Sequence, residues 1–332
     1  MLLSARGWLF AGLAAFVLLA ALLHLWVGGS VAITPDVVFS QLFAGPGGQD
    51  STNLIIWQIR LPRLITALAA GGLLGAVGAA FQALFRNPLA EPYIIGVSSG
   101  AALGGTLAIL AGLSGMLAGL ALPLFGFVGG MGALGLVLLL ARVSGGRRVE
   151  TLLLAGVVMG SLLSALVSIV LILAGEDTNA VLRWLLGSVT PAEWSRGGIL
   201  WGVLTLSGPL LWLQSRKLNA IAISEEAAGI SGVEVKRVQA VVLTVGTAGA
   251  SAAVGTCGVI PFLGLVAPHM VRKLVGDDLR VVLPGSVLAG GGLLVLADLA
   301  AQQIKRGAEL PVGAVTALLG APILLWLLSR RS

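Results

Sequence analysis

The chain has 332 residues, of which 57% are hydrophobic and only 10% are charged. A soluble domain carries about 25% charged residues, so this chain lacks the polar surface that a water-soluble fold needs. The net charge of +6 does not indicate a nucleic-acid partner, because the basic residues fall in short segments between apolar runs. Composition therefore predicts an all-α, polytopic membrane protein that is surrounded by lipid.

Apolar runs recur along the whole chain, and most are long enough to cross a hydrocarbon layer of about 30 Å. We expect about ten spans, at 8–28, 63–84, 93–113, 118–141, 151–174, 197–213, 238–256, 258–271, 281–303 and 310–328. The eighth is expected to be short and irregular, since Pro261 and Pro268 interrupt its hydrogen-bond ladder. Together the spans form a single transmembrane domain over residues 1–332.

Glycine occurs 48 times, and several glycines stand four residues apart, as at 71/75, 96/100/104 and 126/130. In lipid such spacing lets helix backbones approach closely, so we interpret it as helix packing.

The distribution of Lys and Arg predicts the orientation. With the N-terminus inside, cytoplasmic segments hold 14 of the 20 basic residues. The six outer ones are Arg60, Arg63, Arg183, Arg196, Lys305 and Arg306. The positive-inside rule therefore places both termini in the cytoplasm of a bacterial or archaeal cell whose cytoplasmic (inner) membrane the chain spans.

No catalytic or metal-binding pattern is present. Cys257 is a lone cysteine, and His24 and His269 lack metal-ligand spacing. No G-x-x-x-x-G-K-[ST] sequence occurs, so we expect no enzyme activity and no cofactor in this chain. Asp298 is the one acid well inside an apolar run, which disfavours an ion-coupled transporter. The energy source is expected in another chain.

The polar segment at about 214–237 contains a short helical pattern. Ser224 suits an N-cap, and Glu225 and Glu226 in the first turn suit the positive end of a helix dipole. Gly229 or Gly232 can end the helix in a left-handed conformation. Two readings stay open: an ordinary loop helix, or a rigid knob on which a partner docks.

The second span begins at Arg60-Leu61-Pro62-Arg63, where Pro62 fits the first helical turn. Arginines on the outer side run against the topological bias. They either snorkel to lipid headgroups or form a surface for carboxylates of a partner.

Six ordered segments resemble the FecCD-type permeases, which import ferric siderophores, haem and cobalamin. They are Arg60–Arg63 running into Phe85–Pro92, Gly96–Ala101, Leu152–Gly156, Trp184–Ser188, Phe262–His269 and Glu309–Gly313. The resemblance covers nearly the whole chain after the first span.

The resemblance implies a type II ABC importer fold of about ten helices. It also implies a two-fold permease dimer (a homodimer or a pair with a sister permease), two ATPase subunits that bind ATP-Mg, and a periplasmic or extracellular substrate-binding protein. The family's coupling loop falls on Glu225, Glu226, Ala227, Ala228, Gly229 and Gly232.

The family's outer arginines, which pair with glutamates of the binding protein, fall on Arg60 and Arg63. A further outer arginine of related permeases is replaced by Gln302, so Lys305 and Arg306 are the candidates for that third contact. For the pathway and its gate, the candidates are Leu89, Val149, Gly156 and Gly160.

The cargo is the open question. The 184–188 segment is more similar to iron-chelate members, which favours ferric siderophore or haem, and cobalamin is the alternative. Two other classes of protein are an ion-coupled secondary transporter and a membrane enzyme or scaffold. Both are disfavoured by the missing residue patterns given above.

Overall fold

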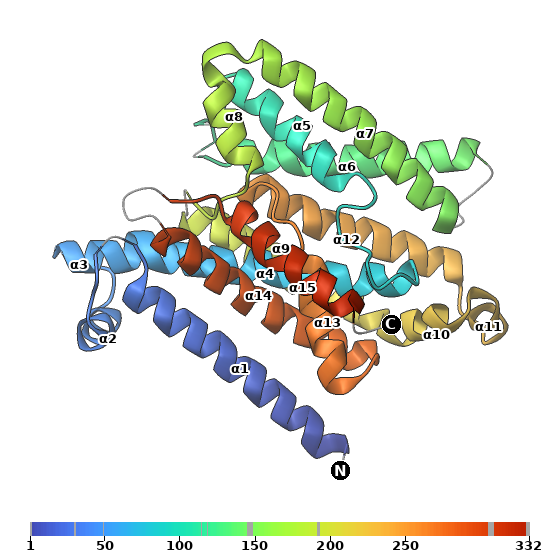
Figure 1. Cartoon of the computed structure of the whole chain (residues 1–332), viewed down its shortest axis with the longest axis horizontal. Helices are drawn as coiled ribbons and strands as arrows, with labels where there is room; N and C mark the ends of the chain where they lie inside the picture. Colours follow the sequence, from blue (N-terminus) through green and yellow to red (C-terminus); the bar gives the residue numbers. More distant parts are fainter. Residues whose placement is uncertain are drawn as a thin grey trace.

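The computed structural model describes residues 2–29, 31–48, 50–113, 115–117, 119–144, 149–190, 193–304 and 309–329, with the backbone alone for 2–5 and 324–329. In these residues every regular element is a helix (Figure 1). The helices are α1 (Leu2–Val27), α2 (Pro35–Ala44), α3 (Ser51–Leu54), η1 (Ile55–Arg60), α4 (Leu61–Leu84), α5 (Val97–Leu110), α6 (Ala121–Val143), α7 (Val149–Leu173), η2 (Gly175–Asp177), α8 (Thr178–Leu185), α9 (Trp194–Leu213), α10 (Ser215–Ile223), α11 (Glu225–Ile230), α12 (Val235–Cys257), α13 (Leu263–Val275), α14 (Leu279–Gln303) and α15 (Val312–Ser329).

Each of the ten predicted spans coincides with one of these helices, so the all-α membrane fold is confirmed. In the part of the chain that the structure describes, six helices are long and apolar enough to cross a membrane: α1, the continuous 51–84 helix, α6, α7, α12 and α14. The helices α5 and α15 are apolar but shorter. Ten is therefore an approximate count of spans.

The central pair of helices is α4 and α14, which cross the middle of the bundle (Figure 1). Almost every α4 side chain is buried. The predicted role of the spaced glycines is confirmed here, because Gly71 lies against the backbone of Gly290 and Gly75 lies against that of Ser286. A side chain at either glycine would push the two helices apart.

The helices α1 and α7 lie on opposite sides of the bundle (Figure 1), and their apolar side chains are mostly exposed. An exposed apolar helix surface in a membrane protein faces either lipid or another transmembrane subunit.

The two ends of the bundle differ. One end, named here the α11 end, carries α10, α11 and the first turns of α1 and α14, which are joined by hydrogen bonds of Arg6 and Asn219 to Asp278. The opposite end, named the α2 end, carries α2, α3 and α8. Figure 1 shows that α1 begins and α15 ends toward the α11 end.

The expected irregularity of the eighth span is present. The chain leaves α12 at Cys257, runs without helix through 258–262, and begins α13 only at Leu263. Phe262, directly before α13, has φ +66°. Pro268 lies inside this short helix.

Candidate functional site

The segment at 214–237 forms two short helices, α10 and α11. The Ser224 Oγ atom accepts a hydrogen bond from the Ala227 N–H at 3.3 Å, which confirms the predicted N-cap. Gly232 follows with φ +81°, while Gly229 lies inside α11. The two isoleucines that end α10 and α11, Ile223 and Ile230, are 83% and 90% exposed. The two helices form a projection with an apolar tip.

The projection is fixed to the bundle by its inner side. Leu218, Ile221 and Ala228 are buried in the main apolar cluster. On the polar side, Asn219 donates to Asp278 at 3.0 Å and accepts from the Leu279 N–H at 3.0 Å. These contacts link α10, and with it α11, to the start of α14.

Asp278 is the junction of this end. Its carboxylate caps α14 through the Arg280 N–H at 3.1 Å and forms ion pairs with Arg280 at 2.8 Å and Arg6 at 3.2 Å. The hydrogen bond from the Arg280 side chain, together with those from the Arg280 N–H and from Asn219, lowers the pKa of Asp278 to about 2. The carboxylate thus stays ionised at neutral pH and holds α1, α10 and α14 together.

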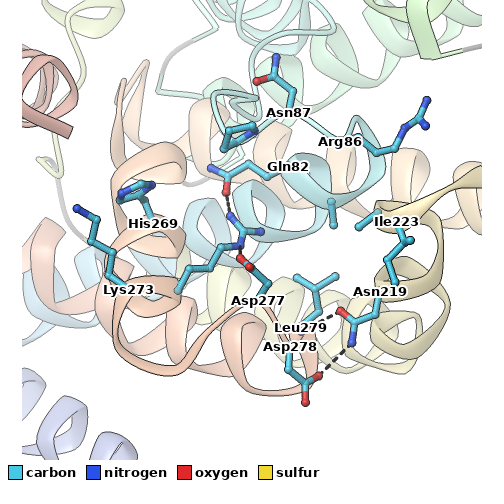
Figure 2. Close-up of a pocket in the computed structure, with 14 residues that line it drawn as sticks. Gln82, Arg86, Asn87, Asn219, Ile223, His269, Lys273, Asp277, Asp278 and Leu279 are labelled. Carbon is cyan, nitrogen blue, oxygen red and sulfur yellow. Dashed lines mark hydrogen bonds and ion pairs between the residues drawn. The ribbon is translucent and has the colours of Figure 1, made fainter. Parts of the chain in front are cut away.

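A cavity of about 720 Å³ opens beside α10, between the end of α4 and α13 (Figure 2). Arg272, one of its lining residues, donates a hydrogen bond to Gln82 and also pairs with Asp277 at 3.6 Å. Ile223 and Leu279 form part of its wall. Among the described residues no group of three His, Cys, Asp or Glu side chains could hold a metal ion.

At the α2 end, Arg63 is buried and directed into the protein. It donates to Asp298 from Nε at 2.7 Å and from Nη2 at 2.8 Å, and its Nη1 atom donates to Glu309 at 2.7 Å. Asp298 also contacts His24 at 2.9 Å and accepts from Gln302 at 2.8 Å. This network joins α1, α4 and α14.

Arg60 is buried as well, and it donates to the backbone oxygens of Leu25, Val31 and Trp26, the last at 3.1 Å. Each guanidinium thus has partners inside its own chain, rather than only lipid headgroups or a partner protein. Their predicted role in docking is not tested by this geometry and stays a prediction. Lys305 and Arg306 lie outside the described residues.

The pathway candidates fall in two groups. Leu89 is 42% exposed, on a turn whose N–H groups are held by Asn87. Val149 and Gly156 are buried, and a Cβ on Gly156 would lie 2.6 Å from the Ile94 backbone oxygen.

Gly160 lies beside Gly96. Gly156 and Gly160 therefore both pack against the 94–96 segment of their own subunit. The exposed surface of α7 instead carries Ser161, Ser164 and Ser168 between apolar side chains. The predicted role of α7 in the pathway stays open.

A second cavity, of about 620 Å³, lies at the α2 end between α8, the start of α9 and the segment before α15. Arg183, Trp184, Arg196 and Glu309 are among its lining residues, together with Ser188 and Thr190 hydroxyls. Cations, one carboxylate and an indole in one opening suit contact with a large ligand that carries both apolar surface and hydrogen-bond acceptors.

Comparisons with known proteins agree with one another. Residues 15–330 match the FecCD transport family. The chain is 40% identical to the vitamin B12 import system permease protein BtuC of Escherichia coli O127:H6, over 97% of this chain and 95% of the relative. It is 38% identical to the ABC transporter permease protein YvrB of Bacillus subtilis, over 91% and 88% of the two chains.

Among solved structures, the fold matches an inward-facing metal-chelate type ABC transporter with a TM-score of 0.83 and 32% identity, over 98% of this chain and 99% of the other. PsaBC from Streptococcus pneumoniae shares the fold at 20% identity with a TM-score of 0.60.

Proposed function

Because the chain belongs to the FecCD transport family and is the permease subunit of an ABC importer, we propose that it carries a bulky metal chelate inward between two permease copies. ATP hydrolysis takes place in two separate ATPase subunits, in keeping with the lack of a phosphate-binding loop in this sequence. A binding protein delivers the chelate from outside.

The observation that carries this proposal is the α10–α11 projection. Its apolar tip is exposed, its inner side is locked into the bundle, and the α10 cavity opens next to it. A projection that exposes Ile223 at the end of α10 and Ile230 at the end of α11 needs an apolar partner surface to cover them. The ATPase subunit is that partner, and the α11 end, with both termini, lies in the cytoplasm.

The α2 end then faces outward and receives the binding protein. Arg60 and Arg63 lie at this end, and Glu309, whose side chain is half-exposed, links Arg63 to the surface. Since both guanidiniums are buried, ion pairs with the binding protein form at the exposed rim of this end. Exposed pairs contribute about 0–1 kcal/mol each, so they orient the binding protein more than they hold it.

Docking through the arginines is tested with Arg63→Lys, which keeps the charge and loses the planar fork. We expect weaker binding of the binding protein to a complex that still assembles. Unchanged binding by the Arg63→Lys complex, shown by its melting temperature to be folded, would place docking elsewhere on this end.

The cargo pathway runs between the two permease copies, along the exposed surface of α7 and along α15. ATP-driven closure of the ATPases moves α11, and α10 passes this motion to α14. Beyond Glu150 in its first turn, the exposed part of α7 carries no charged side chain in the described residues, which suits a large chelate that must slide without being held.

Cobalamin is the first cargo to test, because the relatives that are 40% identical are vitamin B12 permeases. Ferric siderophore and haem are the other candidates. The test uses proteoliposomes that contain the permease, its ATPase and its binding protein loaded with each chelate in turn. We expect one of the three chelates to stimulate ATP hydrolysis and to be taken up. Uptake that persists without the ATPase would instead identify a secondary transporter.

The role of α11 is tested with Ile230→Ser. The side chain is 90% exposed, so we expect little loss of permease stability but a clear loss of ATPase co-purification. Phe43→Ser is the matched control, since Phe43 is equally exposed but lies at the α2 end. Equal ATPase binding by the wild-type chain and the Ile230→Ser variant would contradict the docking role of α11.

A further inference from the structure

The loop between α4 and α5 holds the irregular link that precedes α13. Glu91 Oε1 accepts a hydrogen bond from the Phe262 N–H at 2.7 Å, over a sequence separation of 171 residues. Two residues later, the Tyr93 hydroxyl donates to the Ile260 oxygen at 2.9 Å and accepts from the Ile260 N–H at 3.3 Å. Two side chains of one loop therefore satisfy the backbone of a distant segment.

Phe262 needs such support. It is one of three non-glycine residues with positive φ in the described part of the chain. A left-handed conformation costs a residue with a Cβ about 1–2 kcal/mol. Phe262 is also the N-cap of α13, where its side chain cannot accept a hydrogen bond. Glu91 makes the bond to the N-cap N–H that a capping-box glutamate makes within its own helix.

The link connects in turn to α15. A Cβ on Gly320 would lie 2.7 Å from Cγ of Phe262, so this ring packs directly on the α15 backbone. A Cβ on Gly264 would lie 2.5 Å from Cδ of Pro92, which puts the loop in contact with the first turn of α13 as well. The position of α15 therefore depends on how the loop holds Phe262.

The same loop touches α7 on its other side. Ile94 and Ile95 lie against Gly156, and the exposed Leu89 turn begins the loop. The loop thus contacts α7 directly and α15 through Phe262, and these are the two helices that we assign to the cargo pathway. Glu91 is largely buried, and this burial raises the pKa of its carboxyl, while the bond from the Phe262 N–H lowers it.

We propose that Glu91 is a positioning residue for transport: its bond to the Phe262 N–H fixes the start of α13 and thereby ties the Leu89 turn to α15. The transport part of this inference rests on the function proposed above. The structural link from the Leu89 turn through Glu91 and Phe262 to α15, called the tie below, does not depend on that function. It can be measured without any cargo.

The test uses the full permease–ATPase complex in nanodiscs with Glu91→Ala and Glu91→Gln. Glutamine keeps an acceptor oxygen in place, whereas alanine removes it and leaves the Phe262 N–H without this acceptor. We expect Glu91→Ala to speed amide hydrogen exchange about tenfold or more in 258–264 and in α15 around Gly320. The Glu91→Gln complex should stay within about twofold of wild type.

A purely local role would speed exchange in 258–264 and leave α15 unchanged, which would overturn the tie. Unchanged exchange in both segments would overturn it as well. Should the alanine variant fail to assemble, Glu91→Asp, whose shorter side chain cannot reach as far, gives the same comparison against Glu91→Gln.

Transport supplies the second readout. With the cargo identified, we expect Glu91→Ala to hydrolyse several times more ATP per chelate imported, and Glu91→Gln to stay close to wild type. An unchanged ratio for Glu91→Ala would make Glu91 structural only and overturn its role in transport. Failure of the wild-type complex to import any chelate would instead refute the proposed function, and the exchange result would still decide the tie.

Discussion

Arg63 on α4 and Asp298 on α14 form a bidentate ion pair inside the bundle, with Nε–Oδ2 at 2.7 Å and Nη2–Oδ1 at 2.8 Å. The two residues are 235 positions apart in the chain, and both side chains are buried. The pair locks together the two helices at the centre of the fold. Arg63 already pairs with Asp298 and Glu309 of its own subunit. To bind a carboxylate of the binding protein, it must either add that contact to these pairs or give one of them up.

We expect Arg63→Met to lower the free energy of unfolding by about 3–5 kcal/mol, because it leaves the Asp298 charge buried without its main partner. Asp298→Asn should cost a similar amount. The double variant should lose clearly less than the sum of the two, since neither charge then remains. Thermal unfolding in detergent micelles measures all three, and additive losses would show that the pair is not coupled.

The cap of α11 offers a separate prediction. Ser224→Ala removes the acceptor for the Ala227 N–H, which costs about 1 kcal/mol in a helix of six residues and should let it fray. We expect weaker coupling of ATP hydrolysis to the loaded binding protein, with the bundle itself unaffected. Ser224→Asp supplies another good N-cap and should restore coupling. If coupling in the Ser224→Asp variant is as weak as in Ser224→Ala, the serine hydroxyl has a role other than capping α11.

Asp278 predicts how stability responds to acid. Its pKa is lowered to about 2 in the folded protein, whereas an unfolded aspartate titrates near about 3.9. The ionised carboxylate therefore stabilises the fold above about pH 4, and this contribution is lost as the pH falls from about 4 to 2. Asp278→Asn should be less stable at neutral pH and should lose less stability over that acidic interval. Melting temperatures of both proteins from acidic to neutral pH test this, and parallel pH curves would contradict it.

Hydrophobicity was enough to predict the spans, because each span depends on local composition. The cap at Ser224 was predictable for the same reason, since an N-cap involves residues only three positions apart. Glycine spacing indicated that helices pack closely but not which helices pair, since Gly71 meets Gly290 far along the chain. The family resemblance and the role as an ABC permease, which rested on six ordered segments, are confirmed by the comparisons.

The partners of the outer arginines were not predictable in this way. Asp298 stands out in the sequence as a lone acid, but nothing local indicates that Arg63 reaches it across 235 residues. Glu91 was missed because it is only one residue of a segment that resembles the family. A glutamate between two prolines in an otherwise apolar stretch is the signal that could have found it, since a carboxylate there needs a donor.

The exposed surface of α7 provides the last prediction. Ser161 and Ser168 stand seven residues apart on one face, and Leu162 and Leu166 stand on the adjacent face. If the serine face lines a wet pathway between two permease copies, cysteines placed there can ionise and react with a water-soluble methanethiosulfonate, whereas cysteines facing lipid or packed helices cannot. The chain suits this experiment because its lone cysteine, Cys257, is buried.

In a Cys257→Ser background and in the assembled complex, we expect Ser161→Cys and Ser168→Cys to be labelled about tenfold faster or more than Leu162→Cys and Leu166→Cys. Binding of ATP should raise the labelling rate of one of the two serine-face cysteines and lower that of the other. Ser161 lies nearer the start of α7 than Ser168, and access to the pathway alternates between the two sides of the membrane. Equal rates on both faces would move the pathway away from α7. Labelling rates that do not change with ATP would indicate that α7 is a static wall of the pathway and that α15 is the helix that moves.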